Sequence, residues 1–488
     1  MIAFADALPL ARLLPECLLV LALVLILAVD VLPAPLARRS GPWLGIAACL
    51  CGLLFARPAD AGPVAAMLVV DPLTSLARTL LLPVVAVVLL AGAGEKKLAD
   101  QPGAWSMAVV GLGFGAALAA AAANFLALWL GLEVIAMASY ALVGLGSGAG
   151  GIARRPAEAG MKFVLFGGVS SAAMLFGISH VYGITGHFDF AGIGASLTAG
   201  APASVLVALL LAGIGVAYKL TLVPFHFYAP DVYQGAPSLG IAAVSVVPKI
   251  GAATALVRFL ATAVPAPAVS GTHLAALLAC LAAVSALFAA FTAVVQKDGK
   301  RILAFSGIGH GASILLAAAC GSGEGAKAAV VFYLLTYAAA NVGAFLCLSV
   351  LERERGSCGL EALAGAREQR PWLVAALCLF VASLAGVPPL AGFLGKWGVL
   401  QQALARGLAA DSSPMLGIAA LLFLVATAIG AWGYLLIVRA VLLAPAPRTA
   451  ANAGRMSPAT WVALATCLLA TFAGGVWLRG LSVLRDLL

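Results

Sequence analysis

Charged residues are scarce in this sequence. Only 10% of its 488 residues are Asp, Glu, Lys or Arg, while 63% are hydrophobic and the mean hydropathy is +1.10. Because an average soluble domain is roughly 25% charged, this composition excludes a soluble protein and indicates an all-α integral membrane protein. The net charge of +9 does not indicate nucleic-acid binding, since the basic residues are scattered through short connectors and form no continuous patch.

Cofactor motifs are also missing. The nine cysteines include no C-x-x-C pair and lie almost all inside apolar runs, so we expect small buried side chains rather than iron–sulfur or zinc ligands. The segment GSGEGAK (321–327) lacks the G-x-x-x-x-G-K-[ST] spacing of a phosphate loop. We therefore expect no cofactor and no metal in this chain.

Fourteen apolar segments approach the length of about 20 residues that a helix needs to cross a bilayer. The boundary between the fourth and fifth segments is marked only by weak turn signals near Asn124. The predicted spans are 13–32, 43–56, 73–94, 105–123, 124–146, 157–184, 204–228, 237–264, 273–295, 301–319, 326–351, 372–404, 414–443 and 457–478.

Lys and Arg follow the alternation of the connectors. Fifteen of them lie in the connectors after spans 1, 3, 5, 9, 11 and 13, whereas six lie on the opposite side. By the positive-inside rule the first set faces the cytoplasm, so both termini are predicted on the other side of the membrane.

Seven cations remain inside predicted spans. Arg78, Arg258 and Arg439 lie within a turn or two of a span end, where a long side chain can extend to the headgroups. Lys162 lies near the cytoplasmic end of its span, where headgroup contact and a functional role are both open.

Three lysines and one carboxylate lie too deep for that explanation. Lys219, Lys249 and Lys396 are roughly 15 Å or more from the nearer end of their apolar runs at 1.5 Å per residue. Glu133 is equally deep, and it is the most plausible counter-charge for Lys219. A central charge costs at least about 2.5–3.5 kcal/mol, so such residues face a partner or a water-filled cavity. A static ion pair that fixes helix packing leaves the surplus lysines unexplained, and we interpret them as proton-binding groups.

Two histidines extend this interpretation. His310 lies nine residues into its span and has a side chain suited to proton relay, although a hydrogen-bonded core histidine is the alternative. His226 follows Pro224 by two residues and is a weaker candidate.

Proline interrupts two spans, the seventh at Pro224 and the twelfth at Pro388 and Pro389. A helix broken within a membrane usually lines a cavity that satisfies its freed carbonyls. The two breaks are five spans apart, which predicts two inverted repeats of five helices. The predicted domains are 1–103 (spans 1–3), 104–264 (first repeat), 265–443 (second repeat) and 444–488 (last span).

Several segments together resemble one protein family. YKLTLVPFHFYAPDVYQGAPS, VSVVPKIGA, DGKRILAFSGIGHGASIL and LAGVPPLAGFLGKWGVL are similar, in matching order between about Asn124 and Val399, to the subunit N family of bacterial proton-pumping NADH:quinone oxidoreductase (respiratory complex I). This family belongs to the antiporter-like subunits. The resemblance implies that Glu133 and Lys219 form a coupling pair with Lys162 as a modulating neighbour, that Lys249 and His310 form a central relay, and that Lys396 is the terminal proton site.

The resemblance also implies partners and a location. The chain would lie in the bacterial inner membrane, with both termini periplasmic, among other membrane-arm subunits and the lipid bilayer. NADH, FMN, iron–sulfur clusters and quinone would be bound by partner subunits, and nucleic acid by none. A sodium/proton antiporter subunit is one alternative, although sodium prefers oxygen ligands and only one deep carboxylate is present. A non-conducting scaffold is the other, and it leaves the cost of the deep charges unexplained.

Overall fold

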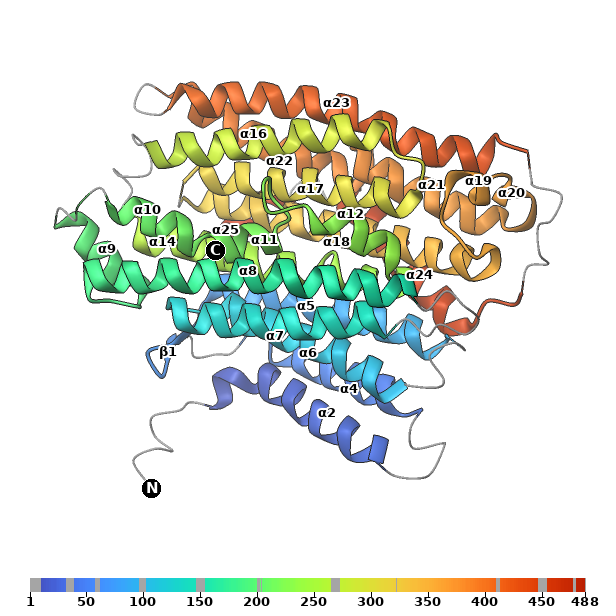
Figure 1. The fold of residues 1–488 in the computed structure, drawn as a ribbon, viewed down its shortest axis with the longest axis horizontal. Helices are drawn as coiled ribbons and strands as arrows, with labels where there is room; N and C mark the ends of the chain where they lie inside the picture. The colour runs from blue at the N-terminus through green and yellow to red at the C-terminus, as the bar shows by residue number, and fades with distance from the viewer. Residues whose placement is uncertain are drawn as a thin grey trace.

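Long apolar helices run side by side through the molecule, with their axes close to the horizontal direction of Figure 1. The computed structural model describes residues 10–31, 39–57, 62–95, 102–145, 154–199, 202, 204–264, 273–321, 323–409, 413–445, 454–476 and 480–487. Within these residues, eleven helices are long and apolar enough to cross a membrane, so the chain is a multi-pass membrane protein. Three shorter apolar helices cover Gly41–Leu54, Ser204–Lys219 and Pro371–Ala385.

Helix occupies part of every predicted span. The N-terminal half contains η1 (Leu10–Leu13), α2 (Leu14–Val31), α4 (Gly41–Leu54), α5 (Pro72–Ala93), α6 (Pro102–Ala121), α7 (Phe125–Gly144), α8 (Arg154–Thr185), α9 (Phe190–Thr198), α10 (Ser204–Ala212), α11 (Ile214–Lys219), α12 (Tyr228–Gly235), α13 (Ser238–Val244) and α14 (Val247–Ala263). The C-terminal half contains α16 (His273–Val294), α17 (Gly299–Ala319), α18 (Glu324–Arg355), α19 (Leu360–Leu363), α20 (Ala366–Gln369), α21 (Pro371–Ala385), α22 (Ala391–Gly407), α23 (Pro414–Leu442), α24 (Pro458–Val476) and α25 (Gly480–Leu487).

A small hairpin departs from the all-α expectation. Strands β1 (Gly62–Val64) and β2 (Leu68–Val70) pair antiparallel, with Gly62 opposite Val70. Each strand is too short to form a recognisable apolar run of its own between the flanking spans, so the hairpin was not predicted. The hairpin and α9 lie at one end of the bundle, whereas α19 and α20 lie at the other (Figure 1).

Both predicted breaks are present. The seventh span ends as a helix at Lys219, and residues 220–227 are not helical before α12 begins. The twelfth span divides into α21 and α22, with residues 386–390 between them. Proline lacks the N–H that would continue a helix, and its ring disfavours helical geometry in the preceding residue, which explains both interruptions.

Close helix contacts hold α7 in place beside these breaks. A Cβ atom on Gly131 would lie 2.7 Å from the backbone nitrogen of Ala119, and one on Gly115 would lie 2.7 Å from that of Ile135. Glycine at both positions therefore lets α6 and α7 approach backbone to backbone, as small residues do in membrane helix pairs. This contact fixes the position of Glu133, which is two residues beyond Gly131.

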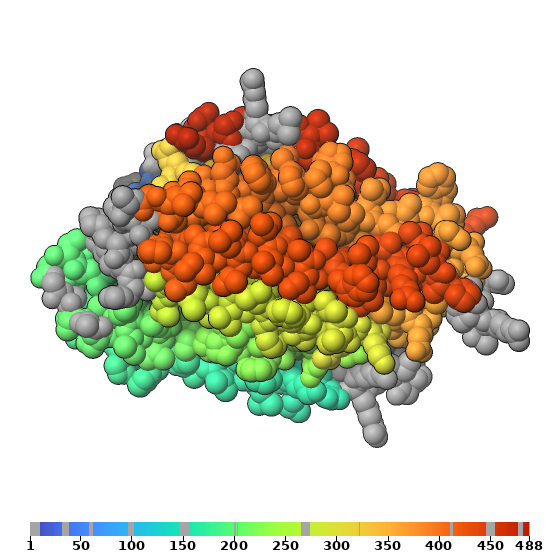
Figure 2. All heavy atoms as spheres, turned by 90° about the horizontal axis from the view of Figure 1, so that it is seen from above, coloured from blue at the N-terminus to red at the C-terminus, as the bar shows by residue number. Residues whose placement is uncertain are grey.

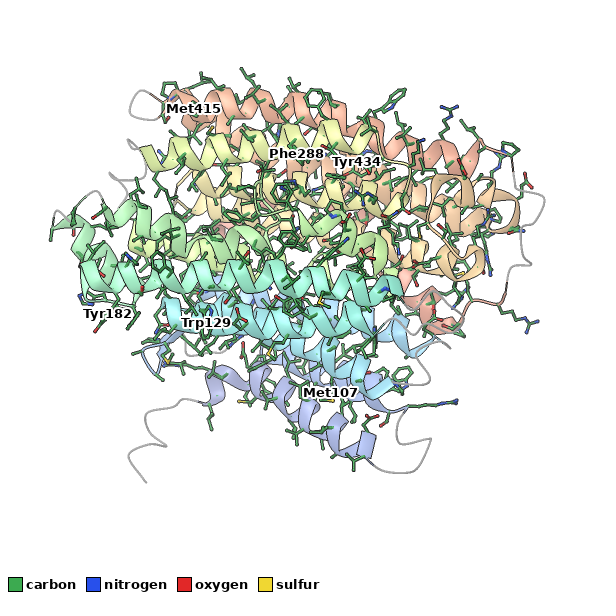
Figure 3. All side chains as sticks on the ribbon, viewed as in Figure 1. Met107, Trp129, Tyr182, Phe288, Met415 and Tyr434 are labelled. Carbon is green, nitrogen blue, oxygen red and sulfur yellow. The ribbon has the colours of Figure 1, made fainter. Side chains whose placement is uncertain are left out.

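The outer faces are apolar. Figure 2 shows α23 lying across one face of the molecule beside α16. Exposed side chains on α23 include Leu421, Leu424 and Trp432, which are 58%, 52% and 56% exposed. In Figure 3, the labels of Trp129 and Met107 mark the positions of α7 and α6. An apolar exterior over a core that contains lysines is the arrangement expected in a bilayer.

Candidate functional site

Glu133 and Lys219 face one small cavity. Glu133 lies midway along α7, and Lys219 is the last residue of α11. The cavity between them has a volume of about 10 Å³ for the centre of a water molecule, which is close to what one water needs. The two charges interact electrostatically, but no direct ion pair joins them in the described part of the chain. Lys219 is only 7% exposed, and its ammonium lies 5.3 Å from the centre of the Tyr218 ring.

Lys249 occupies the backbone gap that Pro224 creates. In a continuous helix the N–H of residue 224 would bond to the carbonyl of Leu220, and proline has no N–H. The ammonium nitrogen of Lys249 takes its place, at 3.4 Å from Leu220 O and 2.9 Å from Thr221 Oγ1. Lys249 is 1% exposed, and both of these partners are uncharged.

Lys396 uses the second break in the same way. Pro389 removes the N–H that would bond to the carbonyl of Ala385, the last residue of α21. The Nζ of Lys396 donates to that carbonyl at 2.9 Å. At each break, therefore, a lysine ammonium binds the carbonyl four residues before a proline.

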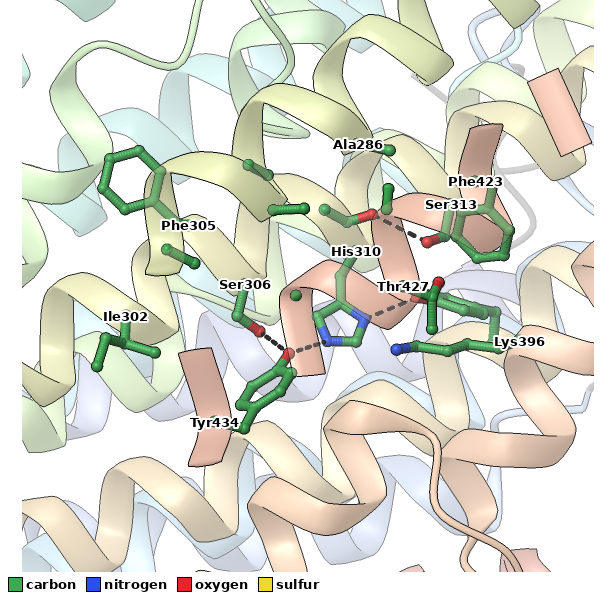
Figure 4. Close-up of a pocket in the computed structure, with 17 residues that line it drawn as sticks. Ala286, Ile302, Phe305, Ser306, His310, Ser313, Lys396, Phe423, Thr427 and Tyr434 are labelled. Carbon is green, nitrogen blue, oxygen red and sulfur yellow. Dashed lines mark hydrogen bonds between the residues drawn. The ribbon is translucent and has the colours of Figure 1, made fainter. Parts of the chain in front are cut away.

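His310 is on α17, and tyrosine hydroxyls contact both of its ring nitrogens. Its Nδ1 is 2.7 Å from the hydroxyl of Tyr333, and its Nε2 is 3.3 Å from that of Tyr434 (Figure 4). Tyr434 also shares a hydrogen bond with Ser306. A neutral imidazole has one donor and one acceptor nitrogen, and each tyrosine hydroxyl can take either complementary role.

A second cavity connects His310 to Lys396. Its volume is about 50 Å³, and its lining includes Ser306, His310, Ser313, Lys396, Thr427 and Tyr434 (Figure 4). Lys249 and Lys396 both interact electrostatically with His310. The space is large enough for a few waters with polar partners on several walls.

Two predicted residues lie apart from these cavities. Lys162 is 41% exposed along its side chain and pairs with Glu158 at 2.7 Å and with Asp231 at 3.3 Å. His226 is 3% exposed and packs edge-on against Phe288, with 4.5 Å between ring centres. Within the described residues its Nδ1 has no hydrogen-bond partner. Neither residue lines the cavity at Lys219 or the one at Lys396.

The expectation that Arg78 and Arg258 extend to the headgroups is wrong. Arg78 is 1% exposed and forms two hydrogen bonds with Glu16, at 2.8 and 2.7 Å. Arg258 is 5% exposed and pairs with Asp71 at 2.7 Å. Both acids are distant in sequence, so position in the span could not identify them. Arg439 is exposed.

Sequence reasoning missed the hydroxyl groups of the site. Thr221 contacts Lys249, and the hydroxyls of Tyr333 and Tyr434 contact His310. In the sequence, each of these residues adds only a single hydroxyl to an apolar run. Charge in a membrane span is a strong signal because it is costly, whereas a hydroxyl is tolerated for many reasons. Among the described residues, no group of three or more His, Cys, Asp and Glu is arranged to hold a metal ion.

Comparison with known proteins identifies the family. A family model described as NADH:quinone oxidoreductase/Mrp antiporter, transmembrane, matches residues 122–411. The chain belongs to this family. The match begins just before α7 and ends after α22, so it contains Glu133, both broken helices and every deep lysine.

Members of the family are similar over nearly the whole chain. NADH-quinone oxidoreductase subunit N of Geobacillus kaustophilus is 33% identical over 485 residues, covering 96% of this chain and 94% of the relative. The subunit of the same name from an Anaeromyxobacter species is 31% identical over 466 residues, covering 91% and 89%.

Solved structures share the fold of this family member. A chain of respiratory complex I from Thermus thermophilus with bound aureothin has a TM-score of 0.77 and 28% identity, covering 96% of this chain and 98% of that one. A chain of the Mrp complex from a Dietzia species has a TM-score of 0.80 at 20% identity, covering 98% and 95%, and shows similarity of fold alone.

Proposed function

We infer that the chain is a proton-translocating membrane-arm subunit of NADH:quinone oxidoreductase of the subunit N type. It works among other antiporter-like subunits in the inner membrane. The observation that carries the proposal is the set of buried lysines beside proline breaks, within a family member whose relatives bear that name. NADH, FMN, iron–sulfur clusters and quinone are assigned to partner subunits.

The finer topology is part of the proposal. Fourteen crossings in two inverted five-helix repeats, with domains at 1–103, 104–264, 265–443 and 444–488, would place both termini in the periplasm. Support comes from the two proline breaks, each of which presents a carbonyl to a lysine. Inverted repeats place such breaks near the bilayer midplane.

Lys249 is suited to change charge without losing its position. Its two contacts, Leu220 O and Thr221 Oγ1, are both hydrogen-bond acceptors. An ammonium has three N–H groups and a neutral amine has two, so either form satisfies both contacts. Protonation therefore alters the charge that His310 experiences while the lysine stays in place, which favours a role as a relay.

The proposed order of proton transfer is Glu133 and Lys219, then Lys249, His310 and Lys396. Glu133 stabilises the charged form of Lys219 when the two approach, and the small cavity between them leaves room for that movement. His310 can accept a proton from the tyrosine hydroxyl at one ring nitrogen while it releases the proton on its other nitrogen to the second tyrosine hydroxyl. Lys396, at the second break, is the terminal site.

Lys249→Met tests this function. The change keeps the length of the side chain and removes the titrating group, so the complex should assemble while proton pumping and the coupled quinone reduction fall sharply. Lys327→Met is the control, because Lys327 lies at the start of α18 and lines a pocket near the β-hairpin that contains none of the proposed relay residues. Proton uptake is measured in reconstituted vesicles together with subunit content. Wild-type pumping with full assembly would remove Lys249 from the mechanism.

A sodium/proton antiporter subunit is the second candidate, favoured by the fold shared with the Mrp complex. Sodium prefers oxygen ligands, and Glu133 is the carboxylate that lines the cavity at Lys219. The same vesicles distinguish the two candidates, because pumping that does not depend on sodium supports the proton role.

A further inference from the structure

Four aromatic rings pack together beside the Glu133–Lys219 cavity. Phe163 on α8 stacks on Tyr228 of α12, with ring centres 4.8 Å apart and planes 14° apart. Tyr140 of α7 meets Phe163 edge-on at 5.0 Å, and Tyr218 of α11 lies 4.4 Å from Tyr228. We call these four residues the aromatic cluster. Phe163, Tyr218 and Tyr228 are 2%, 2% and 5% exposed and exclude solvent, whereas Tyr140 is half-buried.

The inner side of the aromatic cluster forms a wall of the cavity. Tyr140 and Tyr218 line it together with Glu133 and Lys219. Tyr140 is seven residues closer than Glu133 to the end of α7, which is roughly 10 Å along a helix. That end of α7 is next to the start of α8 in the chain, on the side that we propose is cytoplasmic. The cluster therefore lies on the cytoplasmic side of the cavity.

The outer side of the aromatic cluster carries an ion pair. Lys162 immediately precedes Phe163, and Asp231 follows Tyr228 by three residues on the same short helix. The Nζ of Lys162 is 3.3 Å from Asp231 Oδ2, and the other carboxylate oxygen accepts a 2.7 Å hydrogen bond from Arg301. The Lys162–Asp231 pair thus joins α8 to α12 next to the stacked rings.

Hydrogen bonds connect Phe163 and Tyr228 to Tyr218, the residue that precedes Lys219. The Tyr218 hydroxyl donates to the carbonyl of Phe163 at 3.2 Å, and the Tyr228 hydroxyl donates to the carbonyl of Tyr218 at 3.1 Å. Movement of Phe163 or Tyr228 therefore disturbs Tyr218, whose neighbour in the chain is Lys219. Phe163 is the one member of the cluster without a hydroxyl, so its ring cannot take part in a hydrogen-bonded proton path.

We propose that the aromatic cluster is a closed gate between the cytoplasmic surface and the Glu133–Lys219 cavity, and that Lys162 and Asp231 are positioning residues that hold Phe163 on Tyr228. The assignment of sides rests on the proposed function. Lys162 then influences Lys219 through the rings of the gate and not by direct contact. Its distance from the cavity is the reason that it can respond to the surface.

The gate is tested by chemical access. Ala136 lines the cavity and is 3% exposed, so Ala136→Cys places a reporter thiol inside. Inside-out membrane vesicles containing the assembled complex are treated with a membrane-impermeant, negatively charged methanethiosulfonate, and labelling of the reporter peptide is measured by mass spectrometry. Phe163→Ala should raise the labelling rate about tenfold, because the reactivity of a buried group follows the cost of local opening.

A second variant leaves the ring packing intact. Lys162→Met should raise labelling by a smaller factor of about three, since it removes the ion pair and retains Phe163. Glu158→Gln is the matched control, because it removes the other partner of Lys162 and leaves the pair with Asp231. Glu158→Gln should therefore label like the parent.

Labelling that is unchanged in both Phe163→Ala and Lys162→Met, in complexes with normal subunit content, would overturn the gate. Equal acceleration by Lys162→Met and Glu158→Gln would overturn the positioning role of the Asp231 pair. The assay needs no turnover, so failure of the Lys249→Met pumping test leaves its result unaffected, and the two proposals fail separately.

Discussion

The backbone of α17 lies against the first helix break, and this contact allows a direct test of whether the break positions Lys249. A Cβ atom added at Gly311 would lie 2.0 Å from the carbonyl oxygen of Leu220, whereas ordinary contact begins near 3.4 Å. The obstacle is backbone, so no side chain can rotate away. Gly311→Ala must therefore move residues 220–221 or α17 by more than about 1 Å, which exceeds the tolerance of a hydrogen-bonded site.

This displacement falls on the partners of Lys249. Leu220 O and Thr221 Oγ1 both accept from its Nζ, at 3.4 and 2.9 Å. Misplacement of a reacting group by about 1 Å can reduce a rate by roughly 100-fold, so we expect pumping by Gly311→Ala to fall roughly 10- to 100-fold. The measurement is the initial rate of proton uptake in vesicles, normalised to the content of this subunit.

Gly309→Ala is the matched control on the same helix. A Cβ atom there meets only the Cβ of Ala289 at 3.8 Å, which is ordinary contact. Replacing a helical glycine by alanine otherwise stabilises a helix by roughly 0.5–1 kcal/mol, so this variant should assemble and pump normally. If Gly311→Ala pumped at the rate of Gly309→Ala, the claim that the break positions Lys249 would be refuted.

Two further predictions concern hydroxyl groups and buried arginines. Tyr434→Phe should slow pumping several-fold, because the Nε2 of His310 loses its hydrogen-bond partner. Tyr337→Phe is the control and should not slow pumping. The Tyr337 ring packs on the His310 ring with 4.6 Å between centres, but its hydroxyl donates to the carbonyl of Ser245. Equal rates in these two variants, measured in vesicles, would remove Tyr434 from the relay. Arg78→Met should destabilise the subunit by about 3–5 kcal/mol, because Glu16 would stay buried without a partner. Arg258→Met should lower stability less, since Asp71 is 34% exposed and still caps α5 by accepting from Thr74 N. Heat-induced loss of the subunit from the purified complex ranks the two variants. A greater loss for Arg258→Met than for Arg78→Met would contradict the burial argument.

Hydropathy and proline determined much of this protein from sequence alone. Apolar runs located the helical segments, because a chain in hydrocarbon must satisfy its backbone within each segment. The high cost of charge in a membrane singled out Glu133, Lys219, Lys249 and Lys396, and Pro224 and the Pro388–Pro389 pair marked the breaks. These are local signals, since each follows from one segment and its solvent.

Tertiary structure alone decided which groups meet. Lys249 binds the carbonyl that Pro224 leaves free, Lys396 binds the one that Pro389 leaves free, and His310 lies between two tyrosines from α18 and α23. Arg78 and Arg258 find acids 62 and 187 residues away in sequence, where a position near a span end had suggested lipid headgroups. Lys162, predicted as a modulating neighbour of the coupling pair, instead pairs with Glu158 and Asp231. Partners such as these are set by the packing of one helix against another, and the spacing of residues along a single helix contains no record of that packing.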